Sequence, residues 1–225
     1  IQKVHRRICL RKGNPMKRKI AEHLLNIQAV FLSPDKPFVW ASGIKSPIYC
    51  DNRITLSDHL VRADIEKGLA ELIIKNYPQC EVIMGTSTAG IAHAAITAHI
   101  LGLPMGYVRS SAKDHGRGNR IEGRLLPGQK TVVIEDLIST AGSVIDTVEA
   151  LREEEAQVLG IASIFTYGMA KGVQRLKEAN VRNISLTDFD TIIEVACEKG
   201  YIKQNDKNKL LTFRDNPSDE GWIEA

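Results

Sequence analysis

The sequence VVIEDLISTAGS at residues 132–143 indicates how this part of the chain folds and what it binds. Three β-branched residues predict a buried strand that leads into two adjacent carboxylates, Glu135 and Asp136. The residues that follow are Leu137, Ile138, Ser139, Thr140, Ala141, Gly142 and Ser143, a short apolar step and then a small, hydroxyl-rich turn. Beyond them the apolar residues of VIDTVEALREEEA recur at helical spacing. The stretch predicts a strand, an acidic strand end, a turn and a helix.

This order of elements is typical of a ligand site in a parallel sheet, where ligands bind at the carboxyl ends of the strands. A helix that begins there offers unpaired backbone N–H groups and the positive end of its dipole, which suit a phosphate. Two carboxylates would repel a phosphate, but they accept hydrogen bonds from sugar hydroxyls or hold Mg²⁺. The pattern therefore points to a sugar phosphate. The alternative is an ordinary strand end and helix N-cap, where Asp, Ser and Thr are common.

Length and composition are those of a soluble globular protein. The chain has 225 residues, of which 43% are hydrophobic and 25% charged, enough for one well-buried domain. No apolar run reaches the roughly 18 to 20 residues of a membrane span. The four cysteines form no CxxC pair, which argues against a zinc site or a disulfide framework and favours a reducing compartment. We therefore expect a cytoplasmic protein without a membrane partner.

The net charge of +3 is unevenly distributed. Residues 1–19 hold eight basic residues and no acid, so that the remaining residues carry a net charge of −5. A mildly acidic body argues against a nucleic-acid-binding face. Residues 1–15 also lack the apolar core of a signal peptide, and Met16 begins a helical pattern. We expect residues 1–15 to be a disordered or non-native extension and residues 16–225 to form a single domain.

Strands and helices alternate along most of the remaining chain. Strand-like segments are EVIMGTS, LPMGYVR, QKTVVIED, VLGIASIFTY and NISLT, and helical segments separate them. This alternation predicts an α/β fold in which helices cover both faces of a parallel sheet. Before it come a helical pattern over residues 60–77, another over residues 17–31, and a predicted hairpin around Ser42-Gly43. We expect the N-terminal helix and hairpin, about residues 16–58, to form a small hood over a core of about residues 59–225.

Two other segments have the composition of phosphate-binding elements. The string GTSTAG at residues 85–90 follows a predicted strand and opens a predicted helix, as a second anion site would. The string RSSAKDHGRG at residues 109–118 brings Arg109, Lys113 and His115 together in a glycine-rich loop. Such a loop predicts a mobile cationic lid over a polyanion. The alternative is a solvated basic loop without function.

Four strings, in this order and at these separations, resemble the orotate phosphoribosyltransferases, a family of type I phosphoribosyltransferases: FVWASGIKSPIYCDNR, GTSTAGIAHAA, VRSSAKDHGRGNRIEG and VVIEDLISTAGS. The last string is similar to the signature with which that fold binds phosphoribosyl diphosphate (PRPP). The first and third strings separate this family from the purine phosphoribosyltransferases. The resemblance covers nearly everything except residues 1–15.

The resemblance implies the type I phosphoribosyltransferase fold and a pentosyl transfer. Orotate and PRPP would give orotidine 5′-monophosphate and diphosphate in pyrimidine synthesis, on the route to UMP. It implies Mg²⁺ as cofactor, held mainly by PRPP rather than by a metal site of the protein. It also implies a homodimer in which the mobile loop reaches into the site of the neighbouring subunit.

The same resemblance assigns roles to residues of this chain. Arg109, Lys113 and His115 match the loop residues that contact the diphosphate, and Glu135 and Asp136 match the acids that face the ribose hydroxyls. Lys113, Arg109 and Mg²⁺ would stabilise the charge that develops on the leaving diphosphate, and His115 would donate a hydrogen bond or a proton to it. Residues 137–143 would line PRPP, Ser139 to Ser143 forming the cradle of its 5′-phosphate, and Ser139 would also approach orotate.

Several positions depart from the family pattern. Many members have a Lys at Ala41, a Tyr-Lys pair at Thr88-Ala89, a second basic residue at Ser110 and, in some, an orotate-contacting Arg at Tyr167. The phosphate cradle usually has a Gly where this chain has Ala141. If that position needs a positive φ, alanine costs roughly 1 to 2 kcal/mol there.

Three other functions are compatible with parts of the sequence. A purine or other base phosphoribosyltransferase would share VVIEDLISTAGS but should lack the KDHG loop and the KSP hairpin. A regulator with the same fold, binding PRPP and nucleic acid without catalysis, should have a basic face and a lost loop. A flavodoxin-like nucleotide-binding domain would not account for the paired acids before the hydroxyl turn.

Overall fold

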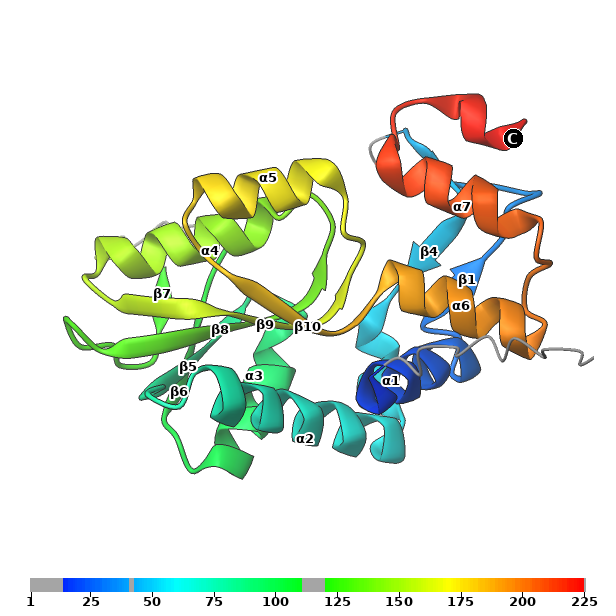
Figure 1. The fold of residues 1–225 in the computed structure, drawn as a ribbon. Helices are drawn as coiled ribbons and strands as arrows, with labels where there is room; N and C mark the ends of the chain where they lie inside the picture. Colours follow the sequence, from blue (N-terminus) through cyan, green and yellow to red (C-terminus); the bar gives the residue numbers. More distant parts are fainter. Residues whose placement is uncertain (1–13, 41–42, 111–119, 225) are drawn as a thin grey trace, which may run out of the picture.

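The computed structural model describes residues 14–40, 43–110 and 120–224. At its centre is a six-stranded sheet in the order β10-β9-β8-β5-β6-β7, in which β7 is antiparallel to β6 and the other neighbouring strands are parallel (Figure 1). The strands are β5 (Val82–Thr86), β6 (Met105–Val108), β7 (Ile121–Glu122), β8 (Lys130–Ile138), β9 (Gln157–Thr166) and β10 (Asn183–Asp188). The α/β class and the parallel sheet expected from the sequence are confirmed.

The sheet is buried on both faces, which explains why its strands read as apolar runs. Along β8, Val132 and Ile134 belong to one hydrophobic core, whereas Val133 between them belongs to a second core. Successive side chains of a strand point to opposite faces, so each core fills one side of the sheet. Every residue of β5 is buried as well.

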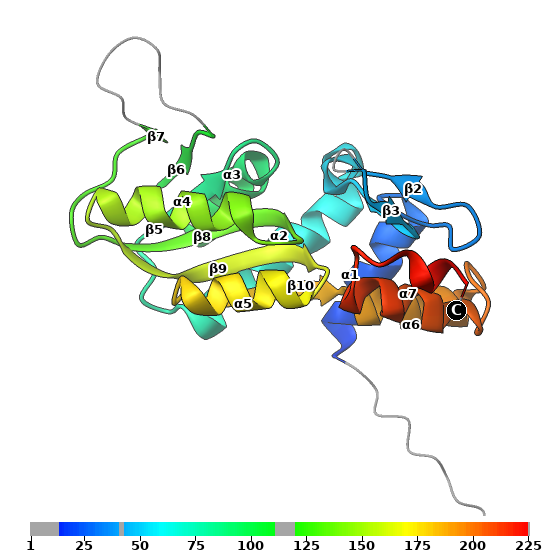
Figure 2. The ribbon, with the colours of Figure 1, turned by 90° about the horizontal axis from the view of Figure 1, so that it is seen from above.

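Two pairs of helices cover these faces. Helices α2 (His59–Asn76) and α3 (Gly90–Leu101) lie on one face, and α4 (Gly142–Glu153) and α5 (Ala170–Glu178) lie on the other (Figures 1 and 2). The helix expected over residues 60–77 is α2. None of the helices in the described parts of the chain is long and apolar enough to cross a membrane.

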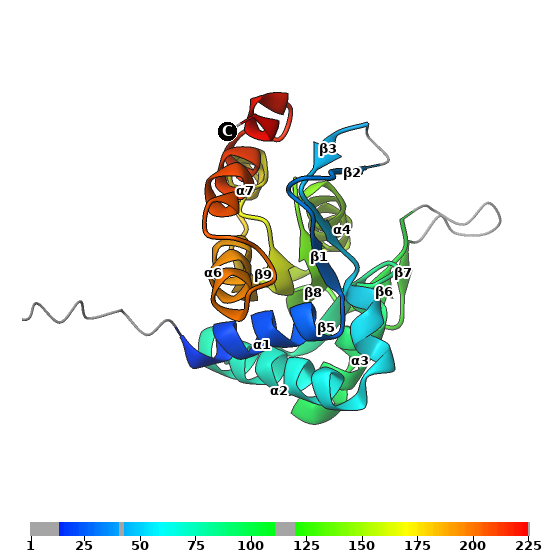
Figure 3. The same cartoon turned by 90° about the vertical axis from the view of Figure 1, so that its right-hand side faces the viewer.

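The hood is built from both ends of the chain. Its N-terminal part comprises α1 (Pro15–Asn26), β1 (Val30–Leu32) paired with β4 (Ile48–Cys50), the expected hairpin β2 (Phe38–Val39) and β3 (Lys45–Ser46), and the 3₁₀ helix η1 (Asn52–Ser57). The C-terminal helices α6 (Phe189–Lys199) and α7 (Asp206–Asp215) and the 3₁₀ helix η2 (Glu220–Ile223) stand beside them (Figures 1 and 3). Helix α6 packs on α1. From the sequence, only the N-terminal elements were expected in the hood.

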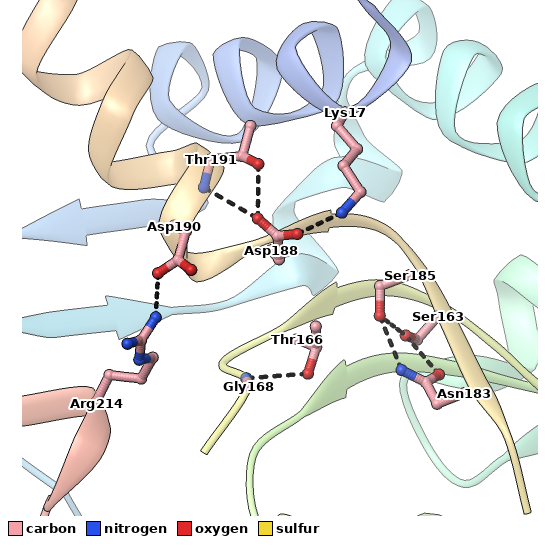
Figure 4. A network of polar contacts seen from close by, with 10 residues as sticks. All are labelled: Lys17, Ser163, Thr166, Gly168, Asn183, Ser185, Asp188, Asp190, Thr191 and Arg214. Carbon is pink, nitrogen blue, oxygen red and sulfur yellow. Dashed lines mark hydrogen bonds and ion pairs between the residues drawn. The ribbon is translucent and has the colours of Figure 1, made fainter. Parts of the chain in front are cut away.

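A network of polar contacts joins the hood to the sheet (Figure 4). Asp188, the last residue of β10, forms an ion pair with Lys17 of α1 and accepts the backbone N–H of Thr191 at 3.0 Å, which caps α6. Arg214 of α7 pairs in turn with Asp190 of α6. Helices from both ends of the chain are therefore held at the carboxyl end of the same strand.

Candidate active site

The two small-residue turns singled out in the sequence lie side by side. β5 and β8, which lead into them, are adjacent parallel strands whose pairing runs to Gly85 and Ile134. At Gly90, the first residue of α3, a Cβ would lie 2.5 Å from the Ile134 carbonyl oxygen. Only glycine permits this approach, so the residue type brings the start of α3 against the end of β8.

The acid pair occupies the end of β8. Glu135 is 4% exposed, and its carboxylate accepts the backbone N–H of Asp136 at 3.1 Å and the hydroxyl of Ser143 at 3.3 Å. Asp136 is half-buried, and its carbonyl oxygen accepts the side-chain amide of Asn52 at 2.7 Å. One acid is thereby tied to the start of α4 and the backbone of the other to the hood.

Burial raises the pKa of Glu135 well above its ordinary value, and the neighbouring carboxyl of Asp136 raises it further. The hydrogen bonds from the Asp136 N–H and Ser143 act in the opposite direction. A buried acid of this kind suits a partner that donates hydrogen bonds, as sugar hydroxyls do. Such an environment is also typical of functional sites.

The turn from residue 139 to 143 has the geometry of an anion cradle. Ala141 has φ 61° and ψ 14°, in the left-handed region, and α4 begins at the next residue. No side chain caps this helix, and the backbone N–H groups of Ala141, Gly142 and Ser143 have no acceptor among the described residues. Unpaired N–H groups at the amino end of a helix bind phosphate readily.

Leu137 and Ile138, the apolar residues of the predicted site, pack into the hydrophobic cores and not into the turn. Ile138 is buried in the core shared with α4, and Leu137 packs against the core on the other face of the sheet. Their side chains hold the strand in place, so at this site they offer backbone groups only. Ser139 and Thr140 are half-buried in the turn itself.

The structure describes the cationic loop only at its base. Lys113 and His115 lie outside the described residues. Arg109 follows β6. Its backbone N–H donates to the Arg120 carbonyl oxygen at 2.8 Å, and its carbonyl oxygen accepts from Nε of Arg120 at 3.1 Å. Its guanidinium lies 3.7 Å from the carboxylate of Glu122. Arg109 thus reaches the carboxyl edge of the sheet, and its role toward a diphosphate stays a prediction.

Two contacts that shape the site were not expected from the sequence. Asn52 links the hood to Asp136, and Arg175 of α5 donates from Nη1 to the Thr140 carbonyl oxygen at 3.2 Å. These partners are 84 and 35 residues apart in the chain, so no local pattern could have revealed them. Tyr167 is 3% exposed and packs edge-on against Trp40 of the hood at 5.6 Å.

Similarity to known proteins identifies the family of this chain. The family model "Phosphoribosyl transferase domain" matches residues 55–199. Orotate phosphoribosyltransferases of Bacillus cereus (strain G9842) and Bacillus cytotoxicus are each 59% identical to this chain over 210 residues, which is 93% of this chain and 100% of the relative.

Solved structures agree in fold. The crystal structure of orotate phosphoribosyltransferase from Aeropyrum pernix is 29% identical, with a TM-score of 0.71 over 81% of this chain and 99% of that one. UMP synthase of Leishmania donovani has a TM-score of 0.76 at 20% identity, over 88% of this chain and 42% of that one, and shows the fold alone. With a family model over more than half of its length and relatives at 59% identity, the chain belongs to the phosphoribosyltransferase family and, within it, to the orotate phosphoribosyltransferases.

Proposed function

We propose that this chain transfers the 5-phosphoribosyl group from PRPP to orotate, which gives orotidine 5′-monophosphate and diphosphate. The observation that carries the proposal is the buried acid pair beside a turn with unpaired backbone N–H groups, at the carboxyl edge of a parallel sheet. Such an arrangement suits a sugar phosphate, and the relatives at 59% identity are orotate phosphoribosyltransferases, which supports orotate as the base.

Backbone N–H groups and carboxylates of the site would bind different parts of PRPP. The N–H groups of Ala141, Gly142 and Ser143 would bind the 5′-phosphate, while Glu135 and Asp136 would accept hydrogen bonds from the ribose hydroxyls. This fixes C1 of the ribose for attack by orotate, whose nitrogen forms the new bond as the C1–diphosphate bond breaks. Ser139, at the start of the turn, would approach the orotate ring.

The negative charge that grows on the diphosphate needs a cationic partner. Arg109 at the base of the loop supports this role by its position at the carboxyl edge of the sheet, and Lys113 and His115 are assigned by the family resemblance. His115 would supply a hydrogen bond or proton to the departing oxygen.

Mg²⁺ fits this arrangement as a substrate-bound ion. It is usually held by one or two carboxylates together with substrate phosphates, and Asp136 beside Glu135 offers such a partner. No cluster of three or more metal-ligating side chains occurs within residues 14–40, 43–110 and 120–224. Mg²⁺ bound to PRPP would neutralise part of the diphosphate charge when it leaves.

We further propose a homodimer that shares its loops between sites, located in the cytoplasm. Supporting the compartment, Cys50, Cys80 and Cys197 are free thiols. The acidic body and the absence of a membrane-spanning helix in the described residues are compatible with it.

The test is the loss of orotate absorbance in the presence of PRPP and Mg²⁺. We expect PRPP-dependent consumption that falls about a hundred- to a thousandfold in Lys113→Ala. Lys67→Ala, which removes an exposed lysine of α2, serves as the control and should match the wild-type chain. Reaction with hypoxanthine, guanine or uracil instead of orotate would show that the chain is a phosphoribosyltransferase for another base. PRPP binding without reaction with any base would instead support a non-catalytic regulator with the same fold.

A further inference from the structure

We infer that Arg175 is a positioning residue for the phosphate-binding turn. Its guanidinium holds the Thr140–Ala141 peptide so that the Ala141 N–H faces the 5′-phosphate of PRPP. This inference rests on the proposed function only in naming PRPP as the ligand of the turn. The resemblance to the orotate phosphoribosyltransferases assigns no role to Arg175.

Helix α5 lies directly on the turn. At Gly172 a Cβ would be 2.3 Å from the Ser139 carbonyl oxygen and 3.5 Å from the Thr140 Cα, so the helix backbone itself touches the turn. Residues three apart share one face of a helix, and Arg175 therefore lies on the same side as Gly172. The close approach at Gly172 brings the guanidinium within reach of the turn.

The guanidinium donates one hydrogen bond to the turn and lies close to Gly142. Its Nη1 donates to the Thr140 carbonyl oxygen at 3.2 Å, and the same atom lies 3.3 Å from where a Cβ of Gly142 would be. A trans peptide is planar, so its C=O and the following N–H point in opposite directions. Because the Thr140 oxygen faces Arg175, the Ala141 N–H points away from α5, on the side where it has no acceptor among the described residues.

The contact also bears on the left-handed backbone of Ala141. Non-glycine residues adopt φ near +60° at a cost of roughly 1 to 2 kcal/mol. The conformation at φ 61° persists only if its surroundings favour it, and the hydrogen bond from Arg175 acts on the peptide that enters this residue.

The charge of Arg175, unpaired among the described residues, lies beside the start of α4 and favours an anion bound at the turn. Arg175 has no carboxylate within ion-pair distance in the described parts of the chain, unlike Arg120 and Arg214, which pair with Asp146 and Asp190. It lies against the first residue of α4, where the helix dipole is positive and disfavours another cation. An anion bound to the unpaired N–H groups of the turn would reduce this repulsion.

The experiment compares Arg175→Gln with Arg152→Gln. Arg152 is a matched control because it also donates to backbone carbonyls, those of Ala179 and Asn180, at the far end of α4. The dissociation constant of PRPP is measured by calorimetry, inorganic phosphate is tested as a competitive inhibitor, and KM and kcat are measured with PRPP and orotate. Thermal unfolding shows whether each variant is folded.

We expect Arg175→Gln to raise the PRPP dissociation constant and KM about tenfold, which corresponds to about 1.4 kcal/mol, with little change in kcat. Phosphate inhibition should weaken in parallel, Arg175→Lys should be intermediate, and Arg152→Gln should bind PRPP as the wild-type chain does. In an Ala141→Gly background, where the turn needs less support, the effect of Arg175→Gln should shrink to about two- to threefold.

An unchanged PRPP dissociation constant in Arg175→Gln would overturn the inference, as would equal weakening in Arg152→Gln. An equal effect with Ala141 and with glycine at that position would also overturn it, since the charge alone would then account for binding. If Arg175→Gln does not fold, unchanged binding in Arg175→Lys has the same meaning. A wild-type chain that binds PRPP but leaves orotate untouched would refute the proposed function and leave this inference standing.

Discussion

Ala141 combines a left-handed backbone with a side chain that disfavours it. Its φ is 61°, it is 4% exposed, and its side chain offers no cap to α4. Glycine would adopt this conformation without the steric cost, although its freer unfolded chain offsets about 0.4 to 1 kcal/mol of the gain. Ala141 therefore has the positive φ at which alanine costs more than glycine.

Ala141→Gly should therefore lower the KM for PRPP relative to the wild-type chain and leave the free energy of unfolding equal or up to about 1 kcal/mol higher. Steady-state kinetics and denaturant unfolding measure the two effects. Glu155→Gly is the matched control, because Glu155 also has a positive φ, of 60°, but follows the far end of α4. It should change stability alone. Equal KM values for Ala141 and glycine would refute the effect on binding.

Glu135 gives a prediction for the pH dependence of stability. Its folded-state pKa is raised by burial and by Asp136, whereas its ordinary value is 4.5. The folded protein thus binds the proton more tightly than the unfolded chain, and stability falls as the pH rises from 4.5 through the folded-state pKa. The contribution of Glu135 to the free energy of unfolding is therefore smallest at and above neutral pH.

Glu135→Gln should accordingly unfold at higher denaturant concentration than the wild-type chain at pH 7 to 8, and the difference should vanish toward pH 4. The same variant should lose about ten- to a hundredfold in kcat/KM, because an amide is a poorer acceptor for ribose hydroxyls. Unfolding curves across this pH range check the first expectation. A stability difference that is independent of pH would show that the ionisation of Glu135 does not cause it.

At the scale of elements, helix α5 depends on Gly172. Alanine would normally strengthen a helix interior by up to about 1 kcal/mol. At this position its Cβ would lie 2.3 Å from the Ser139 carbonyl oxygen, so either the helix or the turn must move.

Gly172→Ala should lower the free energy of unfolding by about 1 to 3 kcal/mol and raise the KM for PRPP by about tenfold. Chemical denaturation and PRPP kinetics provide the measurement. Lys171→Ala, at the exposed neighbouring residue, should leave both quantities near their wild-type values. A more stable Gly172→Ala variant with unchanged KM would mean that α5 does not set the shape of the turn.

Strands, covering helices and both turns could be predicted from the sequence because each leaves a local signal. β-branched runs indicate β5 and β8, and small residues mark the turns that follow. The contacts of Asn52 and Arg175 could not be predicted, since they join residues far apart in the chain and neither residue belongs to a periodic pattern. The share of α6 and α7 in the hood was missed for the same reason: the packing of α6 on α1, and of α7 on α6, depends on the path of the whole chain.

At the scale of the molecule, the hood rests on the edge of the sheet that carries the site. Asn52 holds the Asp136 carbonyl oxygen, Trp40 packs on Tyr167 just after β9, and Lys17 pairs with Asp188 at the end of β10. All three contacts lie at carboxyl ends of strands, where the turns also lie. A second subunit that contributed a loop would have to reach this same edge.

The proposed homodimer with shared loops can be tested with mixtures of two inactive variants. Lys113→Ala and Asp136→Asn each remove one part of the site, and each homodimer should be nearly inactive. If the loop acts on the neighbouring subunit, a mixed dimer combines the acids of one chain with the loop of the other and regains one intact site. Random assembly makes half of the dimers mixed, so coexpressed variants should recover roughly a quarter of the wild-type activity per subunit.

Coexpression of Asp136→Asn with the double variant Lys113→Ala/Asp136→Asn is the control, because no mixed dimer then contains an intact pair of acids. It should stay inactive. The Asn52 hydrogen bond goes to the backbone of Asp136, so Asp136→Asn leaves the link to the hood in place. Recovery in the first mixture and none in the second would establish loops acting between subunits. No recovery in either, from chains shown to form mixed dimers, would assign each loop to the site of its own subunit.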